Sequence, residues 1–284
     1  MSAIHVLLEG LIDYAGLYPP ASLDMVSAVE NYISYSHSSR AFVLGRFVVG
    51  SNRLEEVREV AGENLRDMRL TVVTAASAGW NDLTEFLERS FRIESIETQP
   101  TEIWEIPKIQ KSLPVGIEDY YEIPLGTCSS GMINAISDAG GRAKLRMGGV
   151  VPEAIPPANS VALILMELAA RHIPFKATAG LHHPIRSPHS LTGKTDGPTA
   201  MMHGFLNLAF AAVLLRGGGA AGEALHVLEE EDPAAWSVEP DAVVCRGLRW
   251  TADQLAEMRK KFFLSLGSCS FEEPIQDLEA LGWL

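Results

Sequence analysis

The chain has few cysteines, no cluster of basic residues and no long apolar run, and each absence excludes a class of protein. The three cysteines, Cys128, Cys245 and Cys269, are widely spaced, so we expect neither a disulfide framework nor a structural zinc site. With 23 basic and 36 acidic residues, the net charge is −13, which argues against nucleic acid and anionic membranes as partners. The longest apolar stretch, 206–215, is about half of a membrane span.

The chain also lacks two short signals. Its N-terminus has no basic region followed by an apolar region, as a signal peptide would have, so we expect a reducing cytoplasm. No GxGxxG or Walker-type glycine loop follows the first strand-like run, which argues against a nicotinamide or nucleotide cofactor. What is present is a hydrophobic fraction of 47% and a charged fraction of 21%, the composition of an ordinary folded protein.

Short strand-like runs alternate with amphipathic stretches from about residue 40 onward. The expected strands are 42–49, 70–75, 93–98, 117–123, 143–146 and 175–179, and the expected helices between them are 54–65, 82–91, 106–112, 130–139 and 159–171. Successive strands are spaced as in a strand–helix–strand crossover unit. Repetition of this unit predicts a parallel sheet covered by helices.

A closed (β/α)8 barrel of the TIM type and an open parallel α/β sheet both fit this pattern, and we favour the barrel. The length of 284 residues suits one barrel of ~250 residues, and polar residues recur at the ends of several strands. We expect one domain over 1–284, with a less regular C-terminal segment from about 217. The remaining elements are expected at 6–14 (first strand), 23–35 (helix), 241–245 (last strand) and 274–281 (last helix).

The segment 175–183, Phe-Lys-Ala-Thr-Ala-Gly-Leu-His-His, is the richest in reactive side chains. It begins as a buried strand would and ends in a polar turn. Alternate side chains of a strand share a face, so Lys176, Thr178 and Gly180 point the same way, into the barrel. A lysine buried there either pairs with a strand carboxylate or has a suppressed charge. A neutral amine could act as a nucleophile.

The string 175–180 resembles the Lys-Thr-x-Thr-Gly-type strand of the deoxyribose-phosphate aldolase group, class I aldolase barrels whose strand lysine forms a Schiff base. The resemblance covers six of the 284 residues, and the two histidines are not part of the group's pattern. It implies that Lys176 is the amine nucleophile and that Thr178 hydrogen-bonds the intermediate. It also implies a carbonyl substrate and no required cofactor.

His182 and His183 allow two interpretations. At least one of them could transfer protons or bind an anion. Alternatively both could bind a divalent metal ion together with a carboxylate such as Glu122, if the turn before Pro184 brings them together. Cys269, in the string Ser268-Cys269-Ser270, could be a reactive thiol, but the sequence assigns it no partner.

Several further residues could hold an anionic substrate. Arg146 precedes Gly148 and Gly149; an arginine fork suits carboxylates and phosphates, and glycines let a ligand approach the backbone N–H groups. The alternative is that Arg146 pairs with a nearby glutamate and the glycines form a turn. Arg46 raises the same choice. Asp13 could reach the pocket from the first strand, or it could be a solvent-exposed turn residue.

The sequence therefore predicts an enzyme, a lyase of the aldolase type, that acts on a small anionic carbonyl compound. Lys176 would form an imine, and Glu122 or a histidine would transfer protons. Glu122 could instead neutralise a buried cation such as Lys176. The two rival predictions are a metal-dependent barrel lyase or hydrolase and a non-catalytic barrel that binds a ligand or a partner. The sequence does not determine whether the chain forms a homo-oligomer.

Overall fold

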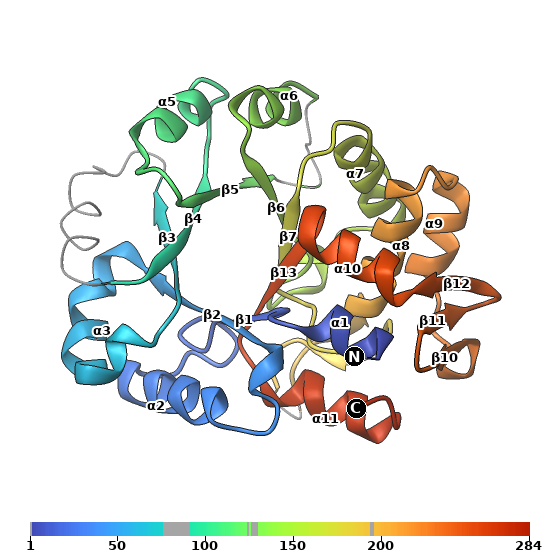
Figure 1. The fold of residues 1–284 in the computed structure, drawn as a ribbon, viewed down its shortest axis with the longest axis horizontal. Coiled ribbons are helices and arrows are strands. Elements are labelled where there is room, and N and C mark those ends of the chain that lie inside the picture. Colours follow the sequence, from blue (N-terminus) through green and yellow to red (C-terminus); the bar gives the residue numbers. More distant parts are fainter. Residues whose placement is uncertain (1, 76–90, 124, 126–129, 194–195) are drawn as a thin grey trace.

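The computed structural model describes residues 2–75, 91–123, 125, 130–193 and 196–284. Parallel strands close into a barrel in the spatial order β1-β13-β7-β6-β5-β4-β3-β2, which confirms the (β/α)8 prediction and excludes the open sheet (Figure 1). The barrel strands are β1 (Ile12–Tyr14), β2 (Leu44–Gly50), β3 (Leu70–Ala75), β4 (Ile93–Gln99), β5 (Glu118–Ile123), β6 (Arg142–Arg146), β7 (Phe175–Thr178) and β13 (Phe263–Ser268).

Helices surround the barrel and connect its strands (Figure 1). They are α1 (Ala3–Leu8), α2 (Met25–Ser36), α3 (Leu54–Ala61), α5 (Glu105–Ser112), α6 (Ser130–Ala139), α7 (Ala158–Ala170), α8 (Phe205–Arg216), α9 (Ala221–Leu228), α10 (Ala252–Lys261) and α11 (Glu272–Ala280). The helix expected at 82–91 lies almost entirely outside the described residues. None of the helices in the described ranges is long and apolar enough to cross a bilayer.

The alternation of side chains along the strands separates an apolar outer layer from a polar interior. On β7, Phe175 packs between the strands and helices with its ring 5.0 Å from that of Phe262, and Ala177 is fully buried. Lys176 has the opposite parity and points into the barrel, where it meets carboxylates from β1 and β4. The predicted inward face of this strand is therefore confirmed. Charged side chains inside the barrel are tolerated because each has partners of opposite sign.

The two strands predicted near the ends of the chain are correct only in part. The run expected at 6–14 is helix α1 followed by the short strand β1. The run expected at 241–245 is β11 (Ala242–Cys245), which pairs antiparallel with β10 (Trp236–Val238) and β12 (Leu248–Thr251) outside the barrel. The strand that closes the barrel is β13. The segment from about 217, expected to be less regular, thus contains α9, this small sheet, α10 and β13.

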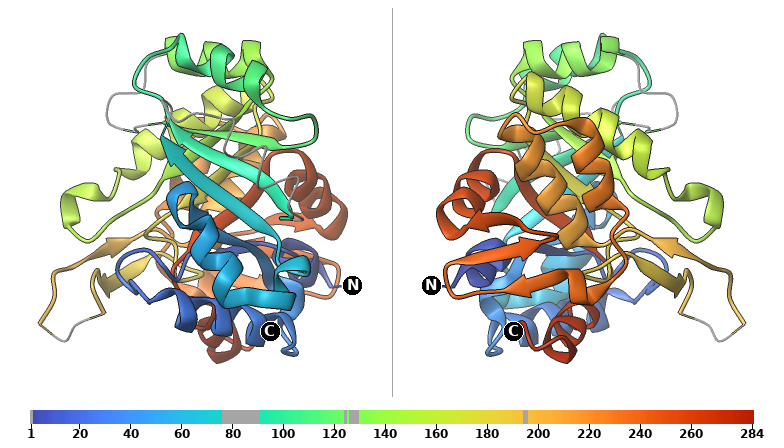
Figure 2. Two further views of the ribbon diagram at one scale, coloured as in Figure 1. Left: turned by 90° about the vertical axis from the view of Figure 1, so that its left-hand side faces the viewer. Right: turned by 90° about the vertical axis from the view of Figure 1, so that its right-hand side faces the viewer.

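A hairpin of β8 (Ser187–Ser190) and β9 (Thr199–Met202) interrupts the connection from β7 to α8. It projects away from the barrel body as a two-stranded arm (Figure 2). Ser190 and Met202 of this hairpin line the large cavity described below. The hairpin therefore forms part of a wall above the carboxyl ends of the strands.

Candidate active site

A cavity of about 1260 Å³ opens at the carboxyl ends of the barrel strands. Its wall includes residues at the ends of β2, β3, β4, β5, β6, β7 and β13 and of the loops that follow them. Barrel enzymes place their active sites at this face because the loops that follow the strands can each contribute a side chain. The charged and reactive side chains on the wall are Glu97, Glu105, Glu122, Lys144, Arg146, His182, His183, Cys269 and Glu273.

Lys144 lies on this wall, and no other lysine among the residues that the structure describes does so. It lies in the middle of β6, and 7% of its side chain is exposed. Its Nζ is 2.7 Å from Oε2 of Glu97 on β4 and 2.9 Å from Oε2 of Glu122 on β5. Burial alone would lower the pKa of Lys144, but the two carboxylates outweigh it and raise the pKa. Lys144 is therefore a charged amine at the floor of the cavity.

Lys176 lies below this floor and does not line the cavity. Its side chain is 0% exposed, and its Nζ is 2.5 Å from Oδ2 of Asp13 and 2.5 Å from Oε1 of Glu97. Burial acts to lower the pKa of Lys176, but Asp13 and Glu97 raise it above the ordinary value. The prediction of a suppressed charge on Lys176 is therefore wrong in this state of the protein. The alternative, a lysine paired with a strand carboxylate, is confirmed for Glu97.

Glu97 and Glu122 both pair with Lys144, and each also pairs with a second cation. Burial acts to raise the pKa of Glu97, yet Lys144 and Lys176 lower it to about 2. The pKa of Glu122 is likewise lowered against the effect of burial, by Lys144 and by Arg146. Both carboxyl groups are ionised at neutral pH. Glu122 thus neutralises Lys144 and Arg146 rather than Lys176.

Arg146 lies at the end of β6, and half of its side chain is exposed. Its Nε donates to Oε1 of Glu122 at 2.8 Å, and a second guanidinium nitrogen donates to Oε2 at 3.4 Å. The predicted pairing of Arg146 with a glutamate is therefore confirmed. Arg146 also faces the cavity, and its binding of a substrate anion stays a prediction. Thr178 lies beside it in the barrel register and also lines the cavity.

The glycines around Arg146 have different roles. A Cβ on Gly148 would lie 2.9 Å from Cα of Gly180, and Gly180 has a φ of +66°. The two loops after β6 and β7 therefore touch through their backbones, and side chains at either position would separate them. Gly149 and Gly180 line the cavity, whereas Gly148 is packed behind it.

The two histidines lie on the part of the wall that follows β7. Nδ1 of His182 is 3.1 Å from Oε2 of Glu273, and its Nε2 is 3.9 Å from Sγ of Cys269. Nδ1 of His183 is 2.6 Å from Oδ2 of Asp277. The rings of His182 and His183 are 6.4 Å apart. Within the described ranges, no group of three His, Cys, Asp or Glu side chains is placed to hold a metal ion.

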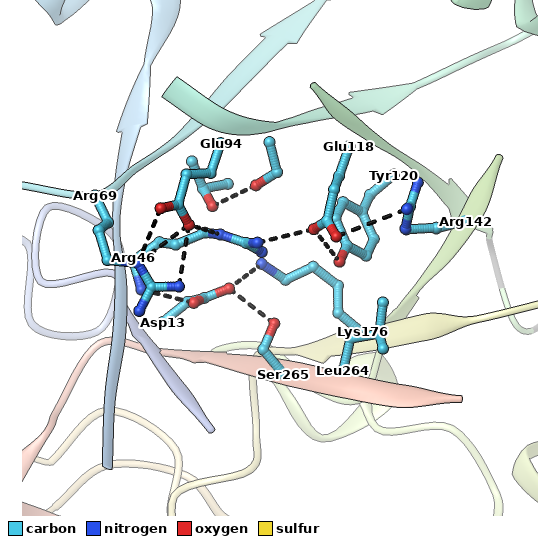
Figure 3. A network of polar contacts seen from close by, with 12 residues as sticks. Asp13, Arg46, Arg69, Glu94, Glu118, Tyr120, Arg142, Lys176, Leu264 and Ser265 are labelled. Carbon is cyan, nitrogen blue, oxygen red and sulfur yellow. Dashed lines mark hydrogen bonds and ion pairs between the residues drawn. The ribbon is translucent and has the colours of Figure 1, made fainter. Parts of the chain in front are cut away.

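Asp13 and Arg46 do not line the large cavity; they belong to an ionic network toward the amino ends of the strands (Figure 3). Asp13 is 1% exposed, and it accepts hydrogen bonds from Ser265 Oγ, Lys176 Nζ and the backbone N–H of Arg46. The guanidinium of Arg46 contacts Glu94 and Glu118. Asp13 thus neither lines the large cavity nor is an exposed turn aspartate. The predictions that Asp13 and Arg46 bind substrate at the mouth are wrong.

Sequence reasoning missed Lys144, Tyr18, Glu273 and the partner of Cys269. The sequence shows Lys144 two residues before Arg146, so the two share a strand face. In the barrel register Lys144 lies beside Lys176. Tyr18 also lines the cavity, and burial together with Glu97 raises its pKa to about 12. Its position depends on the loop after β1, which strand periodicity does not describe.

Comparison with known proteins gives no family. No protein-family model matches the chain, and no curated protein matches it. Two solved structures are similar over part of the chain, those of a single-residue mutant of FabK from Thermotoga maritima and of FabK without this mutation from the same organism, in that order. Each is 14% identical, with TM-scores of 0.38 and 0.36, and covers 65% of this chain. The chain spans 59% and 56% of the length of those proteins.

Proposed function

We propose that this chain is an enzyme, a lyase that acts on a small anionic carbonyl compound through an imine on Lys144. The observation that supports this proposal is the position of the Lys144 ammonium, at the cavity floor between Glu97 and Glu122. The lysine assignment moves from Lys176 to Lys144 because Lys176 is enclosed by its two carboxylates and does not reach the cavity.

Arg146 supplies the recognition of the substrate's anionic group. Its guanidinium is half exposed at the cavity wall, and its fork suits a carboxylate or a phosphate. A substrate anion competes with Glu122 for this fork. When the anion binds, Glu122 loses part of its compensating charge and becomes a stronger base.

The increased basicity of Glu122 also prepares the amine of Lys144 for reaction. Glu122 accepts a proton from Nζ of Lys144 across the 2.9 Å contact, and the neutral amine adds to the carbonyl carbon. Loss of water then gives a protonated imine. When the bond between the α and β carbons of the substrate breaks, its electron pair moves toward this imine and forms an enamine, and the β carbon leaves as a carbonyl whose hydroxyl proton passes to a base in the cavity. Glu97 remains ionised beside Lys144 because Lys176 holds it.

The two rival functions have less support from the geometry. A metal-dependent reaction requires ligands in addition to His182 and His183. In this structure, His182 is paired with Glu273 and His183 is paired with Asp277. A non-catalytic barrel is expected to have Lys176 fully ion-paired, as it is here, but also to have no pocket above it. A cavity of about 1260 Å³ lies there instead.

Borohydride trapping tests the proposal. The protein is incubated with glyoxylate, pyruvate or dihydroxyacetone phosphate, reduced with sodium borohydride and weighed by mass spectrometry. We expect a covalent adduct with at least one of these compounds in the wild type and none in Lys144→Arg, since arginine keeps the positive charge but is not a nucleophile at neutral pH. Lys260→Arg, at an exposed position, is the matched control. Equal trapping in Lys144→Arg would refute the proposal.

A further inference from the structure

Three reactive side chains meet on the cavity wall away from Lys144. Sγ of Cys269 is 3.9 Å from Nε2 of His182, and Nδ1 of the same ring is 3.1 Å from Oε2 of Glu273. The hydroxyl of Ser268 lies 3.4 Å from this Nδ1. A thiol, an imidazole and a carboxylate in this order form the arrangement by which an imidazole activates a nucleophile and a carboxylate orients the imidazole.

The barrel register brings these residues together. β13 lies beside β7, with Gly267 opposite Thr178, so Cys269 and His182 follow neighbouring strand ends. Glu273 is in the first turn of α11, where the helix dipole favours a negative charge. The cluster therefore depends on the pairing of β7 with β13. His182 and Cys269 are 87 residues apart in the sequence, so the sequence alone does not show that they meet.

The charges around His182 favour its protonated form. Burial lowers the pKa of His182, but the contacts with Cys269 and Glu273 outweigh this and raise it to about 9. Two further histidines lie nearby. His183 contacts Asp277 through Nδ1 at 2.6 Å and Glu273 through Nε2 at 4.0 Å, and the ring of His189 stacks on that of His183 with a centroid distance of 3.2 Å.

We propose that Cys269 is a second nucleophile of this cavity, activated by His182 and Glu273, and that it adds to the carbonyl carbon of an aldehyde. In the reactive form, Nε2 of His182 holds the proton that the thiol has given up, and the sulfur forms a bond to the carbonyl carbon. The π electrons of the carbonyl move to its oxygen, which then takes the proton from His182. The product is a thiohemiacetal, and no other reactant is needed. This proposal does not depend on an imine at Lys144.

Alkylation by iodoacetamide tests the activation of the thiol without any substrate. In a Cys128→Ser background only Cys245 and Cys269 remain, and peptide mapping shows which of them reacts at pH 6.5. An ordinary thiol is only about 1% thiolate at this pH. We expect Cys269 to react roughly tenfold faster than a free thiol, because the imidazole of His182 is placed beside its Sγ to take the thiol proton.

Variants separate activation from simple exposure. His182→Gln should remove the roughly tenfold advantage at pH 6.5, and Glu273→Gln should remove part of it, whereas Cys245→Ala should leave the rate at Cys269 unchanged. Circular dichroism confirms that each variant is folded. If Cys269 does not react in the folded protein, or reacts equally fast in folded His182→Gln, the proposal is wrong.

Protection by acetaldehyde tests the carbonyl step. Reversible addition should slow the alkylation of Cys269 in the wild type and to the same degree in Lys144→Arg, where no imine can form. Protection only when Lys144 is present would overturn the assignment of Cys269 as the group that adds to the carbonyl. The absence of protection in both proteins would also overturn it. Neither result bears on trapping at Lys144, which is measured by borohydride.

Discussion

Lys144 and Lys176 lie side by side on β6 and β7, and the single carboxylate of Glu97 separates their charges. Oε2 of Glu97 is 2.7 Å from Nζ of Lys144, and Oε1 is 2.5 Å from Nζ of Lys176. Lys144 lies on the cavity side of this carboxylate and Lys176 on the enclosed side. The two lysines therefore have different physical roles, although they look alike in the sequence.

Replacement of Lys176 should mainly destabilise the fold. Lys176→Met leaves Asp13 and Glu97 partly uncompensated inside the barrel, and loss of one partner of a buried ion pair costs about 3 to 5 kcal/mol. Urea unfolding at pH 7 measures this cost. Lys260→Met, at an exposed position, should change the free energy of unfolding by less than about 0.5 kcal/mol. A Lys176→Met variant as stable as the wild type would contradict the assignment.

Acid should weaken the barrel through Glu97. Because the folded-state pKa of Glu97 is lowered to about 2, its contribution to stability is present above the unfolded value near 4.5 and is lost as the pH falls toward 2. Glu97→Gln should be less stable at pH 7, and its stability should fall less between pH 5 and pH 2.5. Urea midpoints across this range measure both slopes. Parallel slopes in the two proteins would contradict the prediction.

Raising the pH should remove the stabilisation of the fold that protonated His182 provides. Its folded-state pKa is raised to about 9, so the stability that it confers is fully present below pH 6.5 and is lost as the pH rises through 9. The wild type should therefore lose more stability between pH 6.5 and pH 9.5 than His182→Gln does. Thermal unfolding at the two pH values provides the comparison, and an equal loss would count against the charged state of His182.

Close contact between two loops should make Gly180 intolerant of a side chain. Gly180 and Gly193 both have a φ of +66°, but a Cβ on Gly180 would lie 2.9 Å from the backbone of Gly148, whereas one on Gly193 meets no atom within 4 Å. Gly193→Ala should cost only the backbone strain, about 1 kcal/mol, and Gly180→Ala roughly 1 to 3 kcal/mol more. Denaturant midpoints compare the two, and equal losses would rule out the steric cost.

The sequence predicts the fold through its most regular signals. Recurring strand and helix patterns between 42 and 179 led to the barrel, because buried strands and amphipathic helices keep their periodicities even without a known relative. The elements at the two ends of the chain were harder to predict. The run 241–245 has the composition of a strand but pairs in a separate antiparallel sheet, and periodicity alone does not specify the partner of a strand.

The site was predicted only in part for the same reason. Parity placed Lys176 and Thr178 on the inner face of β7, as the structure confirms. How far a side chain lies below the cavity depends on the stagger between strands, so the sequence did not distinguish Lys144 from Lys176. The pairing of Cys269 with His182 depends on β13, whose position in the barrel was not predicted.

The position of the trapped imine tests the central claim most directly. The borohydride-reduced adduct is digested, and tandem mass spectrometry identifies the modified lysine. We predict that the adduct lies on Lys144, which faces the cavity. An adduct on Lys176 would contradict the account, since it would show that the enclosed lysine gives up both of its ion pairs to reach the substrate.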